Sequence, residues 1–532
     1  MRVLRGSGLC AAAIVCVTVA SPAVAKVTPR VSAHGRHVAA LPAARAADEY
    51  DVGVGSRPIN PEANGRWRGA PVYLGGYGIG GPGPLGGGRA ATGILAPYGQ
   101  SVRAITIDDG KSAFVVADIE AQGWFAQTKT GRGLMTMRRR AAVALAHLGA
   151  PVGVEQILIQ SDHTHGGIDP LGVWGGIPAS YEDFIIDQTV AAIVEAWRSR
   201  RPGRLFYGTA DGKDLLSNQF GYDAAHGNDV MDSDVRVLQA RDRSGKPFAT
   251  LLNFSAHATV LDSDNTKVTG DWPAVANPLL EKAFGGRAMT MVGTLGRTQP
   301  NERGDAACKA KPAIAKGDPF QECKLEQYAA RVVARAKLAA AGAKPLGGTP
   351  RVAAHSYLIQ DLSTAPGLLA FEFAGGPVDV PFDRSLQMPW QTLNSFGTVT
   401  SSAVIGDVLL SGAPGEMYPQ IPLRVRGLLP GLRGYMTAGL ANDQLGYLIA
   451  PAGAYPEPVS RTLFDRSGQI RPLDNDNYFF NVSHTLGERV TCSLLRGADD
   501  LLGRDARDRD KDCSFFASDM TMPAGSDVRY GK

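Results

Sequence analysis

VEQILIQSDHTHGG, residues 154–167, joins a strand-like apolar run to a turn that contains two histidines. A segment with apolar residues at helical spacing, SYEDFIIDQTVAAIVEAWRSR (residues 180–200), follows it. Strand-like and helix-like segments interleave in this way along the chain, which predicts a layered α/β domain with mixed β-sheets flanked by helices. If the run stays extended through Asp162, His163 and His165 share one face just past the strand's carboxyl end. Open α/β sheets bind their ligands at that end.

The same patterns predict the neighbouring elements. Hairpins are expected to turn at Asp109-Gly110 and at Ser244-Gly245. Further helices are expected over 132–148, 272–284, 323–341 and 419–429, and further strands over 203–210, 287–293, 351–360 and 434–440. Residues 497–513, GADDLLGRDARDRDKDC, have the composition of a charged, turn-rich surface. The elements up to residue 440 therefore carry the predicted fold.

Composition gives no indication of a nucleic-acid partner, because 55 Lys and Arg against 51 Asp and Glu leave a net charge of only +4 in 532 residues. The one dense basic run, residues 138–140, lies on the helix expected over 132–148, where a solvated face explains it better than a phosphate site. Residues 1–25 are typical of a cleaved signal peptide, followed by a mobile lead-in over 26–48 and one domain over 49–532. The cleaved signal peptide predicts a secreted or periplasmic protein. No later segment is long and charge-free enough to be a transmembrane helix.

Cysteine usage agrees with export, since an even set remains after the signal peptide: Cys308, Cys323, Cys492 and Cys513. Four cysteines allow three disulfide connectivities. The ease of closing short loops favours pairing Cys308 with Cys323 and Cys492 with Cys513.

Three more strand ends carry groups that could bind a metal. His257 ends the apolar run FATLLNFSAH, and Glu416 follows VLLSGAPG at an expected helix start. A polar or phenolic group just beyond the strand GYMTAGL completes the set, with Asn442, Asp443 and Tyr447 as the candidates. Taken singly, the histidine could be a core residue and the glutamate an ordinary helix N-terminal residue. Together with His163 they form a nitrogen and oxygen ligand set suited to Zn²⁺. His165, if it does not bind the metal, could carry protons beside it.

Several segments, in this order, resemble the neutral ceramidase family, secreted zinc amidohydrolases that cleave the N-acyl bond of ceramide. They are VVADIE, IQSDHTHGG, NFSAHATVLDSDNTKVTGDWP, GAPGEMY and LANDQLGYLIAP. The resemblance implies zinc ligands at His163, His257, Glu416 and Tyr447. It also implies that His165 lies beside the metal in the catalytic pocket. Asp271, in TGDWP, matches a family aspartate that shapes the site, and we assign it to the substrate-binding region.

The chain departs from the family pattern where ceramidases contact the substrate. GRTQPN (residues 296–301) stands in place of Gly-Asp-Val-Ser-Pro-Asn, so Gln299 replaces the serine that contacts the reacting amide, and Thr298 is adjacent. Gln219 aligns with a family arginine. Only 85 residues follow Tyr447 (532 minus 447), so we expect no C-terminal β-sandwich domain.

The residues and the resemblance together predict a zinc-dependent hydrolase that cleaves an amide with a metal-activated water, with a lipid-like N-acyl compound as the candidate substrate. Apolar loops over 78–95 and 373–390 are candidates for binding such a substrate. Two alternatives remain. One is a secreted binding protein of the same fold that keeps the metal without turnover. The other is a serine or threonine nucleophile at Thr298, which the absence of a Gly-x-Ser-x-Gly motif disfavours.

Overall fold

The computed structural model describes residues 46–77, 88–218, 230–301, 305–311, 317–363, 395–449, 480–483, 485–504 and 513. All of them belong to one compact unit, Ala43–Lys532. The expected signal peptide and most of the expected lead-in lie outside the described residues, as do residues 78–87 and 373–390 of the expected substrate loops. Among the helices that the structure describes, none is long and apolar enough to cross a membrane.

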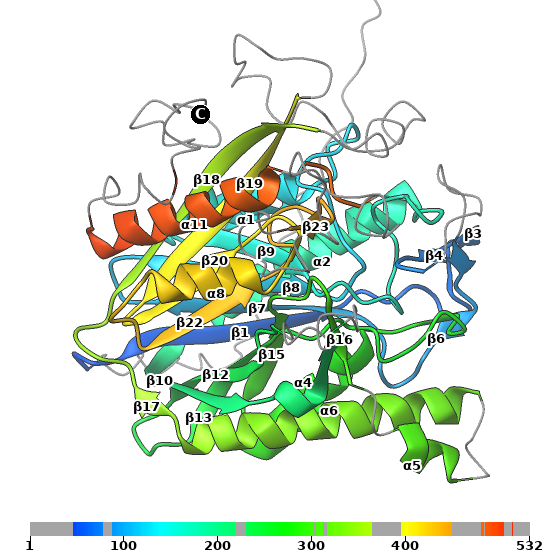
Figure 1. Ribbon diagram of the computed structural model, residues 1–532, viewed down its shortest axis with the longest axis horizontal. Coiled ribbons are helices and arrows are strands. Elements are labelled where there is room, and N and C mark those ends of the chain that lie inside the picture. Colours follow the sequence, from blue (N-terminus) through cyan, green and yellow to red (C-terminus); the bar gives the residue numbers. More distant parts are fainter. Residues whose placement is uncertain are drawn as a thin grey trace, which may run out of the picture. The chain divides into compact units, whose positions relative to one another are not determined.

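The larger sheet has nine strands and is mixed (Figure 1). Its order is β15-β13-β12-β10-β1-β7-β8-β9, with β17 paired to β10. The strands are β1 (Tyr50–Pro58), β7 (Ser101–Asp108), β8 (Ala113–Ile119), β9 (Ile157–Ser161), β10 (Arg201–Asp211), β12 (Asp234–Arg241), β13 (Pro247–Phe254), β15 (Arg287–Val292) and β17 (Lys344–Pro345). β8 pairs in parallel with β9, and β13 with β15, while the remaining pairs are antiparallel. The mixed sheet confirms the predicted fold class.

A second sheet of four strands packs against one face of the first. It has the order β18 (Val352–Leu362), β19 (Ser395–Ile405), β20 (Val408–Gly412) and β22 (Gly434–Ala438). One hydrophobic cluster contains residues of both sheets, such as Val116 of β8 and Leu410 of β20. Val115, next along β8, belongs to a different cluster on the opposite face. Strand alternation thus gives the larger sheet two apolar faces, one for the second sheet and one for helices.

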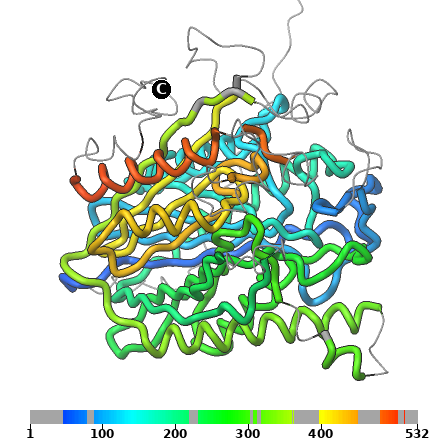
Figure 2. The backbone as a smooth tube through the Cα atoms, in the orientation of Figure 1, coloured from blue at the N-terminus to red at the C-terminus, as the bar shows by residue number. Residues whose placement is uncertain are grey.

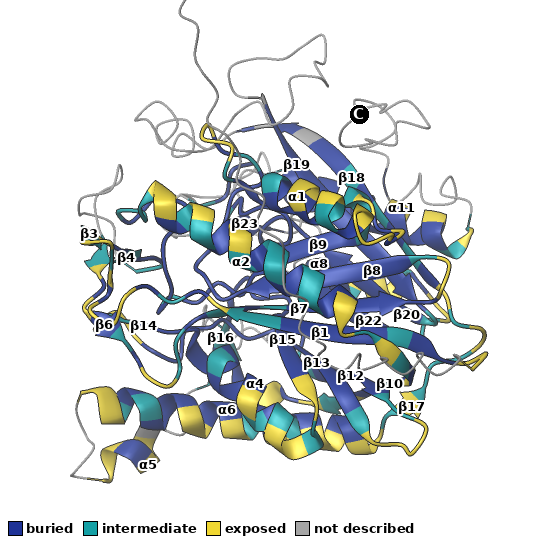
Figure 3. Ribbon diagram, turned by 180° about the vertical axis from the view of Figure 1, so that it is seen from behind, coloured by how far each residue is buried: buried dark blue, intermediate teal, exposed yellow. Residues whose placement is uncertain are grey.

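Helices cover the two outer faces. α1 (Leu134–Ala146) and α2 (Ala179–Arg198) pack on the β7 to β9 side of the larger sheet, and α4 (Asp271–Phe284) and α6 (Asp318–Ala341) pack on the β12 to β15 side. α8 (Gln420–Gly427) and α11 (Leu486–Leu502) cover the smaller sheet. In Figures 1 and 2, α6 runs along the bottom of the view, and α8 and α11 appear in yellow and orange-red. The layers are therefore helix, sheet, sheet and helix, and the view from behind in Figure 3 shows that the strands of both sheets are mostly buried.

The remaining elements are short. They are β2 (Arg66–Trp67), β3 (Ala70–Pro71), β4 (Tyr73–Leu74), β5 (Arg89–Ala90), β6 (Gly93–Ile94), β11 (Leu216–Asn218), β14 (Lys267–Val268), β16 (Thr298–Pro300), β21 (Glu416–Met417), β23 (Tyr447–Leu448), α5 (Asp305–Lys309) and the 3₁₀ turns at Val154–Gln156 and Lys213–Leu215. The structure joins Cys308 to Cys323 and Cys492 to Cys513, as the short-loop argument favoured. Both predicted hairpins form, between β7 and β8 and between β12 and β13.

Two expectations were wrong. The charged segment over 497–513 begins as the last turns of α11, whose buried residues include Val490, Leu494 and Leu501. Their helical spacing against the smaller sheet outweighs the polar composition. Arg138 is not part of a solvated face, because it is fully buried and its guanidinium donates to the carbonyls of Ile157 and Val154. Past β23, the described residues contain α11 and no further named strand.

Candidate metal centre

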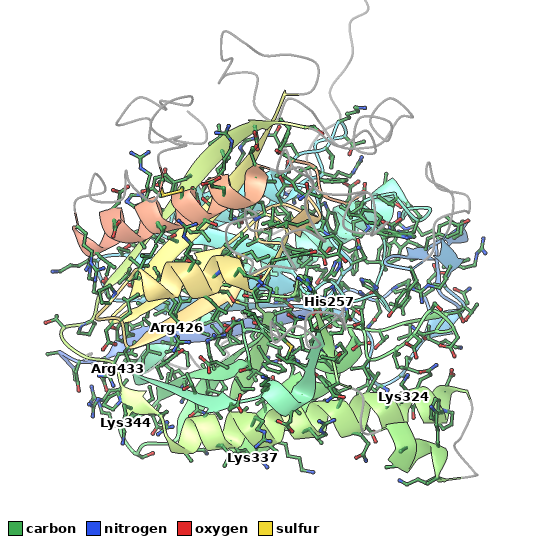
Figure 4. All side chains as sticks on the ribbon, in the orientation of Figure 1. His257, Lys324, Lys337, Lys344, Arg426 and Arg433 are labelled. Carbon is green, nitrogen blue, oxygen red and sulfur yellow. A yellow bond between two sulfur atoms is a disulfide. The ribbon has the colours of Figure 1, made fainter. Side chains whose placement is uncertain are left out.

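Four polar side chains from separate parts of the chain meet at the ends of the strands. His163 and His165 follow β9, His257 follows β13, and Glu416 lies in β21. The nearest side-chain nitrogens of the three histidines all lie within 4.8 Å of one another. Figure 4 labels His257, which lies among the side chains in the middle of the view. The structure thus brings together three of the four predicted ligands and the predicted proton carrier.

The donor atoms are spaced as ligands of one metal ion would be. Nε2 of His163 lies 3.2 Å from Nε2 of His165 and 3.3 Å from Oε1 of Glu416. Nε2 of His257 lies 3.1 Å from Oε2 of Glu416. A tetrahedral zinc site with bonds of about 2.0–2.1 Å places its ligand atoms about 3.3 Å apart. The three imidazoles can therefore hold a metal ion together with the carboxylate.

The hydrogen bonds on the other side of each ring fix which nitrogen faces the centre. Nδ1 of His163 lies 2.6 Å from the carbonyl oxygen of Gln122, and Nδ1 of His257 lies 2.9 Å from that of Thr298. A carbonyl only accepts, so Nδ1 carries a proton and Nε2 is the nitrogen that faces Glu416, as a lone pair when the ring is neutral and as an N–H donor when it is protonated. Lone pairs and carboxylate oxygens repel one another unless a cation lies between them. This donor set fits a bound metal.

Burial and the charges of neighbouring site residues shift the pKa values of Glu416, His163 and His165. Burial opposes ionisation of Glu416, but attraction to His163 and hydrogen bonds from both histidines lower its pKa. Burial likewise lowers the pKa of His163, and attraction to Glu416 more than reverses this, so the net shift is upward. Burial, reinforced by repulsion from His163 and His257, lowers the pKa of His165 well below its usual value. His165 therefore favours the neutral form.

The local backbone differs from the expected extended run. β9 ends at Ser161, and His163 adopts a left-handed conformation with φ of 62°. The two histidines converge because the chain turns at His163, not because they alternate along a strand. Glu416 also differs from expectation, since it lies in a two-residue strand ahead of α8 and not at a helix start. β21 forms here because it pairs in parallel with β23, which is distant in sequence.

Tyr447 is placed beside Glu416 by that pairing. The two residues are direct partners in the parallel register of β21 and β23, so their side chains leave the same face. The phenol ring of Tyr447 is buried, and its centroid lies 6.1 Å from that of Tyr418 in an edge arrangement. The predicted phenolic ligand thus neighbours the predicted carboxylate ligand.

The remaining predicted site residues support the segment around His257. Asp271 is fully buried, and its carboxylate accepts the backbone N–H groups of Val260, Leu261 and Trp272. The side chain that replaces the ceramidase serine, Gln299, accepts a hydrogen bond of 2.6 Å from the Thr259 hydroxyl. The Thr298 side chain is buried, and its hydroxyl lies 3.5 Å from the carbonyl oxygen of Gly296. Gln219 lies outside the described residues.

Gln122 is a site residue that sequence reasoning missed. It follows β8, the parallel neighbour of β9, and its carbonyl orients His163. Its position in the sequence could have indicated this, because polar residues just past adjacent parallel strands lie at the same edge of a sheet. The contact itself is made by the main chain, however, and main-chain contacts leave no trace in residue type.

Comparisons with known proteins give the following relatives. No family model matches the sequence. Neutral ceramidase A of Dictyostelium discoideum is 24% identical over 398 residues, which cover 55% of this chain and 56% of that protein. Neutral ceramidase B of the same organism is 27% identical over 181 residues, 29% of this chain and 25% of that protein. The chain thus matches about half or less of the length of these curated relatives.

Solved structures show that the fold is shared. The crystal structure of neutral ceramidase from Pseudomonas aeruginosa matches with a TM-score of 0.58 and 19% identity, covering 83% of this chain and 75% of that one. A structure titled "Ceramidase complexed with C2" matches with a TM-score of 0.59 and 17% identity, covering 85% and 75%. The resemblance noted from the sequence motifs is confirmed at the level of sequence relatives and of fold.

Proposed function

Because the chain is a relative of the neutral ceramidases in sequence and in fold, we propose that it is a zinc-dependent hydrolase that cleaves an N-acyl amide bond. The observation that carries the proposal is the donor set, in which Nε2 of His163 and Nε2 of His257 lie 3.3 Å and 3.1 Å from the two carboxylate oxygens of Glu416. Nε2 of His165 lies beside these donors, 3.2 Å from that of His163. Carboxylate and imidazole ligands with neutral Nε2 atoms facing inward are the chemistry that Zn²⁺ prefers.

The proposed ligands are His163, His257, Glu416 and Tyr447. A bound Zn²⁺ supplies a polarised substrate carbonyl and a water whose pKa is lowered toward about 7. The carbonyls of Gln122 and Thr298 hold the Nδ1 protons of both histidine ligands, so that Nε2 is the nitrogen that would bind the metal. His165 is proposed to accept a proton at Nε2, the atom that lies 3.2 Å from Nε2 of His163.

The proposed substrate class is an N-acyl amide of lipid-like character, because the relatives are named ceramidases. Gln299 changes the contact that a ceramidase serine makes, since its carbonyl oxygen is already bonded to Thr259. Ceramide is therefore one member of a panel and not the assumed substrate. The same change is what favours the second candidate, a binding protein that retains the metal without turnover.

Export is part of the proposal. The two disulfides are typical of oxidising compartments, which agrees with a secreted or periplasmic protein. Determining the N-terminal residue of the protein recovered from the medium or periplasm tests whether residues 1–25 are removed. Recovery of the full chain from the cytosol alone would contradict export.

Metal analysis followed by a substrate panel tests the hydrolase. The purified protein should contain about one zinc ion per chain. It should hydrolyse at least one N-acyl amide, and a chelator should abolish turnover. His147→Ala, at an exposed histidine on the end of α1, is the matched control and should leave both metal and turnover unchanged. Absence of metal would refute the catalytic model, whereas bound zinc with no turnover on any acyl amide would favour the binding protein.

A further inference from the structure

The three histidines of the centre are held in two different ways. His163 and His257 each place Nδ1 against a backbone carbonyl, which fixes the ring. Nδ1 of His165 is buried, and within the described part of the chain no group lies within hydrogen-bond distance of it. The orientation of this ring therefore depends on packing, together with the contact of its Nε2 with Nε2 of His163.

Two residues outside the donor set, Gly76 and Tyr77, pack against His165, in addition to the rings of His163 and His257. Gly76 has φ of 88°, and a Cβ at this position would overlap the His165 ring, so the glycine backbone lies directly against the imidazole. The Tyr77 ring meets His165 edge to face, with centroids 4.7 Å apart and an interplanar angle of 80°. The Tyr77 hydroxyl donates a 3.0 Å hydrogen bond to the carbonyl of Leu261, in the segment that follows His257.

Arg89 in β5 forms hydrogen bonds with three of the segments around His165. Its guanidinium donates to the carbonyls of Gly75 at 2.8 Å and Asn265 at 2.6 Å, and also to that of His165. Its Cζ atom lies 4.9 Å from the centroid of the Tyr77 ring, within cation–π range. One side chain thus connects the Gly75 to Tyr77 segment, the turn after β9 and the segment after β13.

We infer that Arg89 is a positioning residue that sets the ring of His165 through Gly76 and Tyr77. The inference rests on the proposed function, in which His165 carries a proton during amide hydrolysis. A planar guanidinium with five donors can satisfy three divergent carbonyls and still stack on an aromatic ring, whereas a lysine ammonium cannot do both. In the described part of the chain, the side-chain contacts of Arg89 are with Gly75, Asn265, His165 and Tyr77, and not with the proposed metal ligands. Its loss should therefore displace His165 and leave the metal in place.

Arg89→Ala is the primary test, with Arg241→Ala as the matched control. Arg241 is also half-buried, lies 4.3 Å from the Phe206 centroid and donates to the carbonyl of Ala340, but it is in β12, away from the centre. In Arg89→Ala, kcat should fall about 10- to 100-fold. Zinc content and KM should stay close to those of the wild type, and millimolar guanidinium, but not methylammonium, should restore kcat. Arg241→Ala should leave kcat unchanged.

A readout that does not depend on turnover accompanies the kinetics. In the NMR spectrum of the zinc-loaded protein, the imidazole nitrogen chemical shifts of His165 should differ between Arg89→Ala and the wild type. Those of His163 and His257 should be the same in both proteins. If the wild type hydrolyses none of the amides, the proposed function fails, and this measurement still decides the role of Arg89. Unchanged His165 signals, or loss of zinc together with the rate, would overturn the inference.

A second variant covers the case in which Arg89→Ala does not fold. Tyr77→Leu keeps the arginine and its three carbonyl contacts but removes the ring edge against His165. It should move the same His165 signals and lower kcat with zinc retained. If the His165 signals of this variant match those of the wild type, the Tyr77 ring does not set His165 and the inference is wrong, because Tyr77 is one of the two contacts through which Arg89 is proposed to act.

Discussion

His163 and His165 are two residues apart, yet the structure treats them differently. The left-handed backbone at His163 turns the chain so that both Nε2 atoms face one point, while only His163 has a carbonyl partner for Nδ1. Residue types at strand ends were enough to predict which side chains meet. The carbonyls of Gln122 and Thr298 could not be predicted, because every residue has a carbonyl and only the folded path selects one.

The division of roles between these histidines is testable by mutation. His163→Ala removes a ligand whose ring is fixed by Gln122, so the variant should not retain zinc through dialysis. His165→Ala should keep zinc, measured by metal analysis, and lose turnover by about 10²- to 10⁴-fold because general acid–base assistance is lost. His147→Ala again serves as the exposed control. If both site variants lose zinc to the same extent, His165 is a ligand and the division is incorrect.

Asp271, the first residue of α4, holds the segment after His257 against that helix. Its two oxygens accept the N–H groups of Val260, Leu261 and Trp272, and so hold the segment after His257 against the helix. Asp271→Asn turns one acceptor into a donor that faces an N–H group. We expect the free energy of unfolding, measured with urea at pH 7, to fall by about 1–3 kcal/mol. Asp264→Asn, at an exposed position of the same segment, should change it little.

The same variant carries a pH dependence of defined sign. Burial, opposed by the three backbone hydrogen bonds, raises the pKa of Asp271 from 3.8 to about 6. A carboxyl whose pKa is higher in the folded state loses stabilising effect as pH rises through that window, because the unfolded chain ionises first. The stability advantage of wild type over Asp271→Asn should therefore shrink between pH 4 and pH 7, by up to about 3 kcal/mol. An advantage that grows with pH would contradict the raised pKa.

Among the helices and strands, those with a strong local sequence pattern could be predicted, whereas a strand that forms only by pairing with a distant segment could not. α2, α6 and both hairpins follow from local pattern and turn residues. β21 could not be predicted, because two residues become a strand only by pairing with β23 some thirty positions later. α11 was missed because its charged outer face dominates the composition, although its buried face has helical spacing.

The Cys308–Cys323 disulfide fastens α5 to α6 across a sequence separation of 15. Closing a loop of this size restricts the unfolded chain, and the chain-entropy model gives about 3 kcal/mol. The double variant Cys308→Ala and Cys323→Ala should lose about that much unfolding free energy in urea under oxidising conditions. The Cys492–Cys513 bridge, left intact, is the internal reference. No difference between variant and wild type would mean that this bridge does not restrict the unfolded chain.

On the scale of the whole molecule, the metal centre joins parts that belong to both sheets. His163 and His257 follow strands of the nine-stranded sheet, whereas Glu416 follows β20 and Tyr447 follows β22 of the four-stranded sheet. The two sheets share a hydrophobic cluster, and the centre adds a polar connection at their strand ends. The layered α/β class was predictable from the interleaving of elements. The stacking of two sheets was not, because local sequence does not say which strands share a sheet.

Because ligands come from both sheets, metal binding should stabilise the molecule as a unit. A ligand that binds only the native state adds RT ln(1 + [L]/Kd), about 2.7 kcal/mol at 100 times Kd. Chelation should therefore lower the melting temperature measured by calorimetry, and added zinc should restore it. His163→Ala should melt at the same temperature with or without chelator, because it has no metal to lose, while His147→Ala should respond as the wild type does. A chelator effect of equal size in His163→Ala would place the stabilising metal elsewhere, and the convergence of His163, His257 and Glu416 would then need another explanation.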